Sequence, residues 1–473
     1  MTIVDKNETR TLHPSLDIKD NILILGFRLK KDDGKDVDIY IHRIKDEVYI
    51  TEIPGFNLED GTSISIEKKK RLLAKLSQKW SANGLNKFME SVKDPFGEQL
   101  PKVGLYNKIK DSLRLYVEFE NEADYSILTA WIIGSYLFPM FSAYPYIHIK
   151  APKGSGKSQC LNFILQTAFN AVKARASLPA LRDTVDSLRG TYILDQADCL
   201  YRINMEDILD IFTDSYKRGG GGIRKMIPNK RGWTVEEFDA FGPKAFGSIA
   251  QLPEDLRDRC IVIPLIKSKK NHPQINEEDT IWKEIRGELY SLLINHFQYI
   301  SSIHIFKKIE YKENGSLLGR QLELWLPIET ILSSLSVPEE EIEISKKRFL
   351  SRYEFASYQS TEIEGAVIDT IISLMKDKED IVLHPKEIME KIDSELFEEE
   401  DQFMSQKKRS TVVGRAINKF NLATSKLTRD SQGERYLFTK DHLQKIRDSY
   451  FAENDKKDTP SYIEEKTPIQ STF

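Results

Sequence analysis

Apolar and polar residues alternate along three neighbouring stretches near the amino terminus, at positions 21–29, 37–44 and 47–53. Because successive side chains of a strand point to opposite faces, this alternation predicts a small β-meander. A basic stretch follows from Ile66 to about Val92 and predicts a helix. Its run KKKR at 68–71 either contacts nucleic acid or forms a solvated helix face.

From about residue 121 to residue 301 the pattern changes to short apolar strands alternating with helical stretches. Such alternation predicts a mostly parallel sheet with helices on both faces. The predicted strands are 144–149, 191–194, 244–249 and 260–265, and the predicted helix after the first strand is 159–171.

One long apolar stretch, ILTAWIIGSYLFPMF at 127–141, leads into the first of these strands. It is shorter than the roughly 20 residues of a membrane span, and Pro139 interrupts it. We therefore expect a buried helix packed beside the sheet. The amino terminus is polar and has no signal-peptide pattern, so we expect a cytoplasmic protein with no membrane partner.

The pattern changes again in the last quarter of the chain. Residues 302–358 are predicted to be helical, and a new unit begins near Thr361. Helix, strand, helix, helix and hairpin is the order of a winged helix-turn-helix. The segments with that order are 362–376, 381–383, 385–392, 406–420, 424–428 and 435–439.

Composition narrows the class of protein. The 473 residues include 69 Lys and Arg and 73 Asp and Glu, for a net charge of −4. This balance argues against a polycation wrapped by nucleic acid, although local basic patches still act through local fields. The three cysteines, Cys160, Cys199 and Cys260, are too few and too widely spaced for a disulfide framework or a zinc site.

The segment APKGSGKS at 151–158 matches the P-loop pattern except that Ala151 stands at the first glycine. Gly154 and Gly156 let the backbone turn its N–H groups toward phosphate oxygens, and the following helix adds its positive end. Lys157 supplies a charge for the β- and γ-phosphates, and the Ser158 hydroxyl binds Mg²⁺. A strand before and a helix after complete the required context, so the segment predicts binding of ATP with Mg²⁺. The candidate nucleotide-binding residues are Ala151, Pro152, Lys153, Gly154, Ser155, Gly156, Lys157, Ser158 and Gln159.

A second apolar strand ends in acidic residues at TYILDQAD, 191–198. Asp195 is placed to hold Mg²⁺ through water. Most P-loop enzymes that hydrolyse ATP carry Glu directly after this Asp, whereas this chain carries Gln196. Glutamine can position a water molecule but accepts a proton poorly, and Asp198 is the alternative base.

The order of these motifs resembles that of AAA+ ATPases. Within that class, the order of motifs more specifically resembles that of mobile-element and phage ATPases related to MCM-type and superfamily-three replicative helicases. The resemblance covers about residues 120–335 for the ATPase and 360–450 for the winged helix. The segments that carry it are APKGSGKS, LRGTYILDQAD, YKRGGGGIRK, FGPKAFGSIAQLPEDLRDRCIVIPL and GRQLELWLP.

The resemblance implies further roles around the nucleotide. Gln251 lies nearest to the polar residue that senses the γ-phosphate after the fourth strand. Arg259, or else Arg257, matches the arginine finger that reaches the nucleotide of a neighbouring subunit. A finger in trans implies a homo-oligomer, a hexameric ring or open spiral. The alternative for Arg259 is a surface salt bridge with Asp255 or Asp258.

Arg320 matches a second sensor arginine on a helical lid, or is an ordinary helical arginine. The expected fold is an AAA+-like α/β P-loop ATPase core with an N-terminal α+β domain and a C-terminal winged helix-turn-helix. The predicted domains are 1–120 (β-rich α+β), 121–358 (ATPase core with helical lid), 359–452 (winged helix) and a disordered tail at 453–473.

Two basic regions are candidates for binding DNA. The stretch 216–232 has the pattern of a hairpin with residues 229–232 at its tip, which the resemblance places in a central pore. There Lys230 and Arg231 contact phosphates without reading sequence, unless the segment is a flexible surface loop. The candidates in this region are Lys217, Arg218, Arg224, Lys225, Lys230 and Arg231, and those of the winged helix are Lys407, Lys408, Arg409, Arg415 and Arg435.

Three functions fit these features. The first is an ATP-driven DNA motor, a helicase or helicase-like replication protein of a mobile element, with a primase or polymerase supplied by a separate partner. The second is an ATP-switched DNA-binding initiator, regulator or defence ATPase with weak hydrolysis, which Gln196 favours. The third is an assembly protein that binds ATP without turnover. Winged helices also contact proteins, so the C-terminal region alone does not decide between them.

Overall fold

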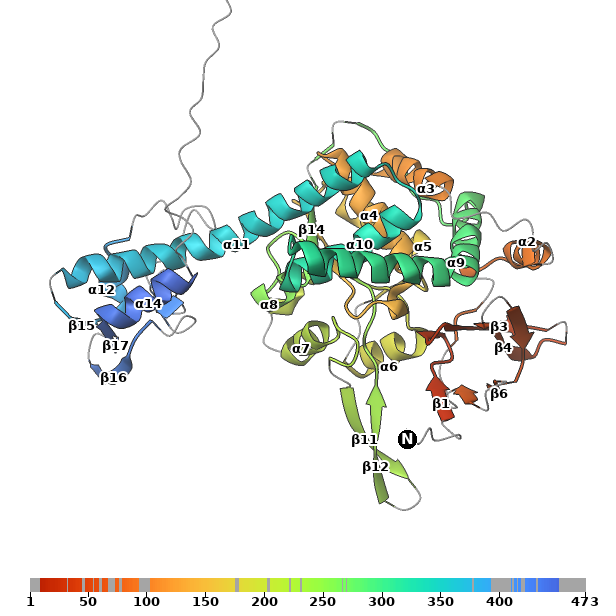
Figure 1. Cartoon of the computed structure of the whole chain (residues 1–473), viewed down its shortest axis with the longest axis horizontal. Helices are drawn as coiled ribbons and strands as arrows, with labels where there is room; N and C mark the ends of the chain where they lie inside the picture. Colours follow the sequence, from red (N-terminus) through yellow and green to blue (C-terminus); the bar gives the residue numbers. More distant parts are fainter. Residues whose placement is uncertain are drawn as a thin grey trace, which may run out of the picture. The chain divides into compact units, whose positions relative to one another are not determined.

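The structure is a computed structural model, and the chain divides into two compact units, residues 1–352 and 353–473 (Figure 1). The predicted domain boundary near residue 120 falls inside the first unit, and the one near residue 359 lies close to the start of the second. The structure describes residues 9–31, 33–44, 47–53, 55–58, 62–66, 73–75, 79–92, 103–174, 178–201, 205–220, 223–229, 232–265, 267–268, 270–376, 378–392, 410, 412–414, 416–417, 422–430 and 433–450.

The predicted meander is present at the amino terminus of the first unit. Strands β3 (Ile22–Lys30), β4 (Asp36–Ile44) and β5 (Glu47–Thr51) pair antiparallel in that order. Alternate side chains such as Ile24 and Tyr40 enter a shared core. Strand β2 (Leu16–Lys19) extends this sheet, while β1 (Thr9–Leu12), β7 (Ser63–Ile66) and β6 (Gly55–Asn57) form a second one.

The helix predicted over residues 66–92 is wrong in its first part. Ile66 ends strand β7, where Ile64 and Ile66 are buried in the core and β7 pairs with parallel strand β1. Alternate residues of β7 are buried, and this burial determines the structure up to Ile66 despite the basic residues that follow. Helix α2 begins only at Ala82 and ends at Val92, and the KKKR run at 68–71 lies outside the described residues.

A five-stranded parallel sheet forms the centre of the first unit, as the alternation of strands and helices predicts. Its order is β14-β8-β13-β10-β9. Because all five strands run the same way, the carboxyl ends of β8, β13 and β10 lie side by side at one edge. The bounds are β8 (Tyr146–Lys150), β9 (Val172–Lys173), β10 (Tyr192–Asp195), β13 (Lys244–Ser248) and β14 (Cys260–Pro264).

Helices cover this sheet. The apolar stretch near residue 127 is the buried helix α4 (Glu122–Gly134), which packs against α10 as well as α3. Within the described residues, no helix is both long enough and apolar enough to cross a membrane. The other elements are α3 (Val103–Tyr116), η1 (Phe138–Met140), α5 (Lys157–Thr167), α6 (Leu178–Leu188), η2 (Ala197–Tyr201), α7 (Glu206–Asp214), α8 (Glu254–Arg257), α9 (Thr280–Asn314) and α10 (Gly319–Ser334).

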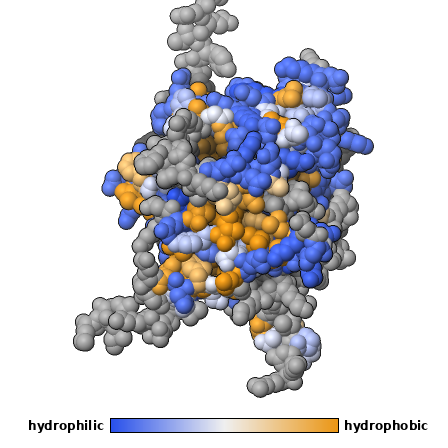
Figure 2. Space-filling view, turned by 90° about the vertical axis from the view of Figure 1, so that its right-hand side faces the viewer, coloured by the Kyte–Doolittle hydropathy of each residue, from blue (hydrophilic) through white to orange (hydrophobic). Residues whose placement is uncertain are grey.

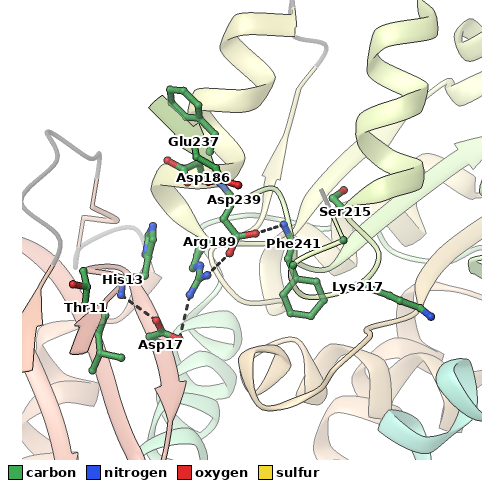
Figure 3. A pocket seen from close by; sticks show the side chains of 14 residues that line it. Thr11, His13, Asp17, Asp186, Arg189, Ser215, Lys217, Glu237, Asp239 and Phe241 are labelled. Carbon is green, nitrogen blue, oxygen red and sulfur yellow. Dashed lines mark hydrogen bonds and ion pairs between the residues drawn. The ribbon is translucent and has the colours of Figure 1, made fainter. Parts of the chain in front are cut away.

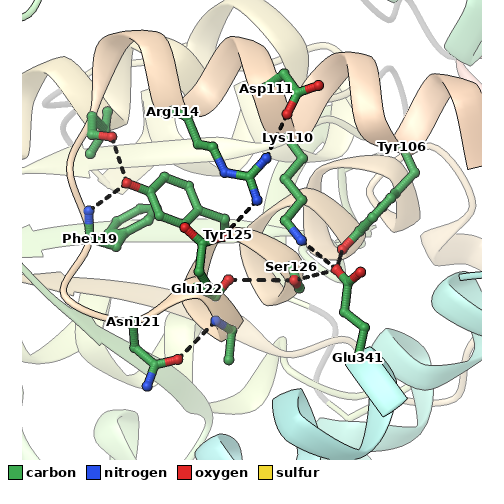
Figure 4. Close-up of polar contacts among 12 residues, drawn as sticks. Tyr106, Lys110, Asp111, Arg114, Phe119, Asn121, Glu122, Tyr125, Ser126 and Glu341 are labelled. Atoms are coloured by element: carbon green, nitrogen blue, oxygen red, sulfur yellow. Dashed lines mark hydrogen bonds and ion pairs between the residues drawn. The ribbon is translucent and has the colours of Figure 1, made fainter. Parts of the chain in front are cut away.

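One carboxylate fastens the start of helix α11 (Glu339–Met375) to α3 and α4 (Figure 4). Glu341 accepts hydrogen bonds from the Lys110 ammonium at 2.5 Å, the Ser126 hydroxyl at 2.7 Å and the Tyr106 hydroxyl. Burial by itself raises the pKa of Glu341, but these donors and the Lys110 charge outweigh it and lower the pKa below its usual value. The carboxylate is therefore held ionised.

The hydropathy of the surface is uneven. Figure 2 looks at the molecule from the side on which Figure 1 places α2, β3 and β4. Hydrophobic residues gather near the middle of that face, and hydrophilic residues surround them (Figure 2).

The second unit has its own hydrophobic core, which includes Ile371, Ile388 and Phe438. Its first helix is not the separate helix predicted at 362–376, because α11 runs without a break from Glu339 to Met375. Residues 410, 412–414 and 416–417 are helical, and the hairpin predicted near residue 430 is present. The remaining elements are β15 (Asp380–Leu383), α12 (Pro385–Met389), β16 (Ser425–Asp430), β17 (Gly433–Thr439) and the unpredicted α14 (Lys440–Tyr450).

Candidate nucleotide-binding site

The P-loop turns at the carboxyl end of β8 and leads directly into α5. Gly154 and Gly156 have φ angles of +82° and +83°, which side chains rarely adopt. A Cβ atom at either glycine would meet no atom within 4 Å, so the backbone faces open space. Helix α5 begins at Lys157, and its first N–H groups have no intrahelical partner. This edge therefore offers several N–H groups and a positive helix end to an anion.

Lys157 lies across strand β13. A Cβ atom at Gly247 would stand 2.7 Å from Cδ1 of Leu161, and 3.2 Å from Cδ and 3.3 Å from Cγ of Lys157. Leu161 and the lysine stem together therefore occupy the space that a side chain at Gly247 would need. With the residues that the structure describes, Lys157 forms no ion pair, so its ammonium group remains available for phosphate. Gly247 is a site residue that the sequence reasoning missed, and its signal was a glycine inside a strand.

The two predicted magnesium ligands lie together. The Ser158 hydroxyl donates a hydrogen bond of 3.0 Å to Oδ2 of Asp195, at the end of β10. A third residue joins them, because Nζ of Lys173 on β9 lies 3.0 Å from the same Oδ2. Lys173 also donates to the Asn162 side chain at 3.1 Å. No sequence motif pointed to Lys173, since β9 has only two residues.

These contacts set the charge of Asp195. Burial would raise the pKa of its carboxyl group, but the hydrogen bond and charge of Lys173, followed by the hydrogen bond of Ser158, lower it below its usual value. A hydroxyl and a carboxylate are hard oxygen donors of the kind that Mg²⁺ prefers. Magnesium takes few protein ligands and completes its shell with water and phosphate, which fits this pair. In the part of the chain that the structure describes, no cluster of three or more His, Cys, Asp or Glu residues offers a larger metal cage.

Gln196 and Asp198 have different surroundings. Gln196 has a φ of +62°, and its N–H donates to Asp195 Oδ1 at 3.0 Å. Its side chain is exposed. Asp198 instead accepts the N–H groups of Ile249 at 3.1 and 3.2 Å and of Ala250 at 2.9 Å. Its carboxylate therefore holds the loop that follows β13.

That loop is also tied to the P-loop strand. His148 on β8 lies 2.6 Å from the Ser248 hydroxyl through its Nε2. The Ser248 hydroxyl donates to the carbonyl oxygen of Ala250 at 2.6 Å, so it accepts the proton on Nε2. Burial lowers the pKa of His148 to about 3 and keeps the ring neutral. Gln251, the predicted sensor, follows this tied segment, and its carbonyl accepts the Tyr201 hydroxyl at 2.8 Å.

The candidate arginines lie around β14 and α10. Arg259 donates to the backbone carbonyl of Asp255, and it forms no ion pair with a described residue. Arg257 is half-buried on α8. Arg320 is held by Asp258 at 2.9 Å and by Glu323 at 2.9 Å. Its guanidinium also lies 4.7 Å from the centre of the Tyr216 ring.

The basic hairpin predicted before the fourth strand is present. Strand β11 (Ile223–Asn229) pairs antiparallel with β12 (Gly232–Phe238), and the pair projects from the first unit (Figure 1). Lys217 forms an ion pair with Glu323 at 2.5 Å. Arg224 and Lys225 lie on β11, and Lys230 and Arg231 lie outside the described residues.

Of the predicted basic residues of the second unit, the structure describes Arg435. Lys407, Lys408, Arg409 and Arg415 lie outside the described residues. Arg435 lies on β17, with its Nε 3.7 Å from Asp430.

A charged cavity of about 300 Å³ lies at the base of the hairpin (Figure 3). Arg189 at its wall forms ion pairs with Asp17 of β2 at 3.3 Å and with Asp239 just after β12. Asp186 accepts the N–H of Asp239 at 2.8 Å, and the His13 N–H donates to Asp17 at 3.1 Å. The N-terminal sheet and the hairpin base therefore share one ion-pair network.

Comparisons with known proteins give little further guidance. No family model and no curated protein matches the chain. The JCV helicase bound to a substituted N-phenylacetamide compound, named in full as N-(4-(2-(thiazolo[5,4-c]pyridin-2-yl)phenoxy)phenyl)acetamide, is 14% identical over 53% of this chain and 68% of that chain, with a TM-score of 0.20. The apo C-terminal region of NrS-1 is 12% identical over 88% and 96%, with a TM-score of 0.29. Drosophila ORC bound to DNA is 11% identical over 81% and 95%, with a TM-score of 0.19. Likeness this low carries no functional argument, so the assignment rests on the geometry of the site.

Proposed function

We propose that the protein is an ATPase of the AAA+ type that acts on DNA, as a helicase or helicase-like replication protein of a mobile element. The observation that carries the proposal is the meeting of three groups at one sheet edge. The open P-loop turn, the uncommitted Lys157 ammonium and the Ser158–Asp195 pair at 3.0 Å form the constellation that a Mg²⁺-nucleotide requires. The basic hairpin beside this core supports nucleic acid as the partner.

The residues divide the chemistry among themselves. The P-loop N–H groups and Lys157 bind the β- and γ-phosphates and orient the terminal phosphorus for attack. Ser158 and Asp195 hold the metal, which neutralises charge on the phosphate oxygens when it is bound. The exposed Gln196 amide orients the attacking water. Asp198 is a weaker candidate for the base, because its carboxylate already accepts the N–H groups of the loop after β13.

A neighbouring subunit completes the site in this proposal. Arg259 has no acidic partner among the described residues, which supports its use in trans, with Arg257 second. Arg320 has two carboxylate partners and a ring beneath it, so its sensor role requires exchange of these contacts. The proposed assembly is a homo-oligomeric ring, probed by mass measurement with a non-hydrolysable ATP analogue. A monomer at every concentration contradicts a finger in trans.

A second function is favoured by Gln196 and Lys173 together. A poor proton acceptor beside an Asp195 already paired with a cation suits a protein that binds ATP, assembles on DNA and hydrolyses slowly. Such a protein is an ATP-switched initiator or regulator. Because a motor and a switch both bind ATP, the rate of ATP turnover is the property that distinguishes them.

The test is ATP turnover with and without single-stranded DNA. Wild type is expected to exceed Lys157→Ala by at least about a hundredfold, because a P-loop without its lysine loses charge on the transferred phosphate. Lys35→Ala, an exposed N-terminal lysine, serves as the matched control and keeps wild-type turnover. If the wild-type protein binds ATP but turns it over no faster than Lys157→Ala does, the motor is excluded and the ATP-switched function remains. If the wild-type protein does not bind ATP, both functions are excluded.

A further inference from the structure

His148 is a buried polar side chain in the middle of strand β8. It is 0% exposed, and the register sets it between Phe246 of β13 and Val262 of β14. Its neighbours along the strand, Ile147 and Ile149, are fully buried as well. A strand that is covered on both faces is normally apolar throughout, so the imidazole requires an explanation.

The imidazole costs the core stability. Its Nε2 lies 2.6 Å from the Ser248 hydroxyl, which gives its own proton to the carbonyl oxygen of Ala250 at 2.6 Å, so the ring must donate from Nε2. The neutral ring then leaves Nδ1 as a bare acceptor, and this atom is buried with no hydrogen-bond partner among the described residues. An unpaired buried acceptor costs free energy that an aliphatic side chain would avoid. What the histidine supplies at this position is therefore the Nε2–H donor.

This donor fixes the direction of a single hydroxyl group. Ser248 has one proton to give, and because its oxygen accepts from His148, that proton is directed to Ala250. The backbone carbonyl of Ser248 also accepts the N–H of Ala151, the first P-loop residue, at 3.1 Å. The strand that carries the P-loop is therefore joined to the turn after β13 through both the side chain and the backbone of Ser248.

That turn, residues 249–251, stands between the two halves of the nucleotide site. The sheet order places β13 between β8, which carries the P-loop, and β10, which ends in Asp195. Asp198 accepts the first two N–H groups of the turn, and Tyr201 donates to the carbonyl oxygen of Gln251. The backbone is thus tied on both sides of Gln251, while the side-chain amide of Gln251 forms no hydrogen bond with any residue that the structure describes.

We propose that His148 is a positioning residue for recognition of the terminal phosphate of ATP. Through the Ser248 hydroxyl it holds the carbonyl group of Ala250 and so directs the Gln251 amide toward a phosphate bound beyond Lys157. The α- and β-phosphates are bound by the N–H groups of the P-loop and need no such turn. The imidazole therefore sets the preference for ATP over ADP rather than the affinity for nucleotides in general. The inference rests on the proposed binding of ATP and names the groups that distinguish ATP from ADP.

The test compares two nucleotides in the full-length chain. Displacement of a fluorescent nucleotide in the presence of Mg²⁺ gives the dissociation constants of ADP and of a non-hydrolysable ATP analogue. His148→Leu is expected to bind ADP within about twofold of wild type and to bind the analogue about tenfold more weakly, because the charged phosphate loses a positioned donor. His148→Gln, whose amide N–H replaces the Nε2–H, is expected to keep most of the wild-type preference.

Two further variants separate positioning from packing. Ser248→Ala removes the acceptor by a smaller change and is expected to show the same loss, also where His148→Leu does not fold. Because the two side chains act as one unit, the double variant should lose no more than either single variant. His304→Leu is the matched control: His304 Nδ1 lies 3.1 Å from the Thr330 hydroxyl, and removal of this second histidine–hydroxyl pair should leave the preference unchanged.

The outcomes separate this inference from the proposed function. A wild-type chain that binds neither nucleotide overturns both. A wild-type chain that binds ADP and the analogue equally well overturns only the inference, and so does a His148→Leu or Ser248→Ala variant that keeps the wild-type preference. Equal weakening of both nucleotides by Ser248→Ala, additive losses in the double variant, or the same loss in His304→Leu also overturn it, because each would show a general structural effect.

Discussion

Lys173 is expected to compete with magnesium for Asp195. Its ammonium lies 3.0 Å from the carboxylate oxygen that also accepts the Ser158 hydroxyl. The two side chains are 28% and 18% exposed, so water screens them only in part. A bare pair at this distance attracts by about 5 kcal/mol at an effective dielectric constant of about 20, and desolvation cancels most of this. Hydrogen bonds to charged groups retain about 1.5–3 kcal/mol.

Lys173→Met keeps the length of the stem and removes the charge. If removal of the ammonium group makes the free energy of Mg²⁺ binding more favourable by about 1.4 kcal/mol, the dissociation constant for Mg²⁺ falls about tenfold. Loss of Lys173 also lets the pKa of Asp195 rise from its lowered value, but an ordinary carboxyl group is still ionised at pH 7. The gain in metal affinity should therefore persist at neutral pH.

The assay is a Mg²⁺ titration of the chain with saturating ATP analogue, followed by the fluorescence of the bound nucleotide. Lys173→Arg retains the charge and should keep the wild-type midpoint. Ser158→Ala removes a ligand while leaving the ion pair, so its midpoint should move to higher Mg²⁺. An unchanged or higher midpoint for Lys173→Met would refute the competition.

Three further predictions concern the site and its support. Gly247→Ala should weaken binding of a fluorescent ATP analogue about tenfold, because the new Cβ would crowd both Leu161 on α5 and the Lys157 stem; unchanged affinity would contradict the packing. Gln196→Glu should raise ATP turnover, while Gln196→Gly, which keeps the positive φ but lacks the amide, should lower it; the reverse order would exclude a water-orienting role. Glu341→Gln should lower the free energy of unfolding in urea by about 2 kcal/mol at pH 7. Because the pKa of Glu341 is lowered in the folded state, this difference should shrink as the pH falls through that pKa, and a difference independent of pH would count against the ionised anchor.

The sequence predicts the phosphate-binding part of the site well. A glycine-rich turn between strand and helix has few other uses, so the positions of Lys157 and Ser158 follow from local chemistry. Asp195 follows too, since parallel strands bring their carboxyl ends to one edge. Lys173 and Gly247 could not be predicted in this way. Each acts through a neighbouring strand, and strand order is not encoded in local spacing.

The fold likewise has features that local sequence predicts and features that depend on distant parts of the chain. The meander follows from alternating apolar and polar residues, whereas the parallel sheet and the buried helix α4 follow from apolar runs that are buried almost without a break. The helix predicted from Ile66 is wrong because β7 pairs with β1, and that partner lies far away in the sequence. Helix α11 continues past the predicted unit boundary, since nothing in its sequence ends it there. The domain limits and the winged helix remain predictions.

The ion-pair network around Arg189 has a consequence for how this chain can be divided. Asp17 comes from the first strands, Arg189 follows α6, and Asp239 leads out of the hairpin. A shortened chain that begins at the predicted ATPase core would lose Asp17 and leave a poorly exposed guanidinium with one acidic partner. The amino-terminal sheet is therefore not a detachable module that could be exchanged freely between relatives. We expect it to be inherited together with the hairpin whose base it braces.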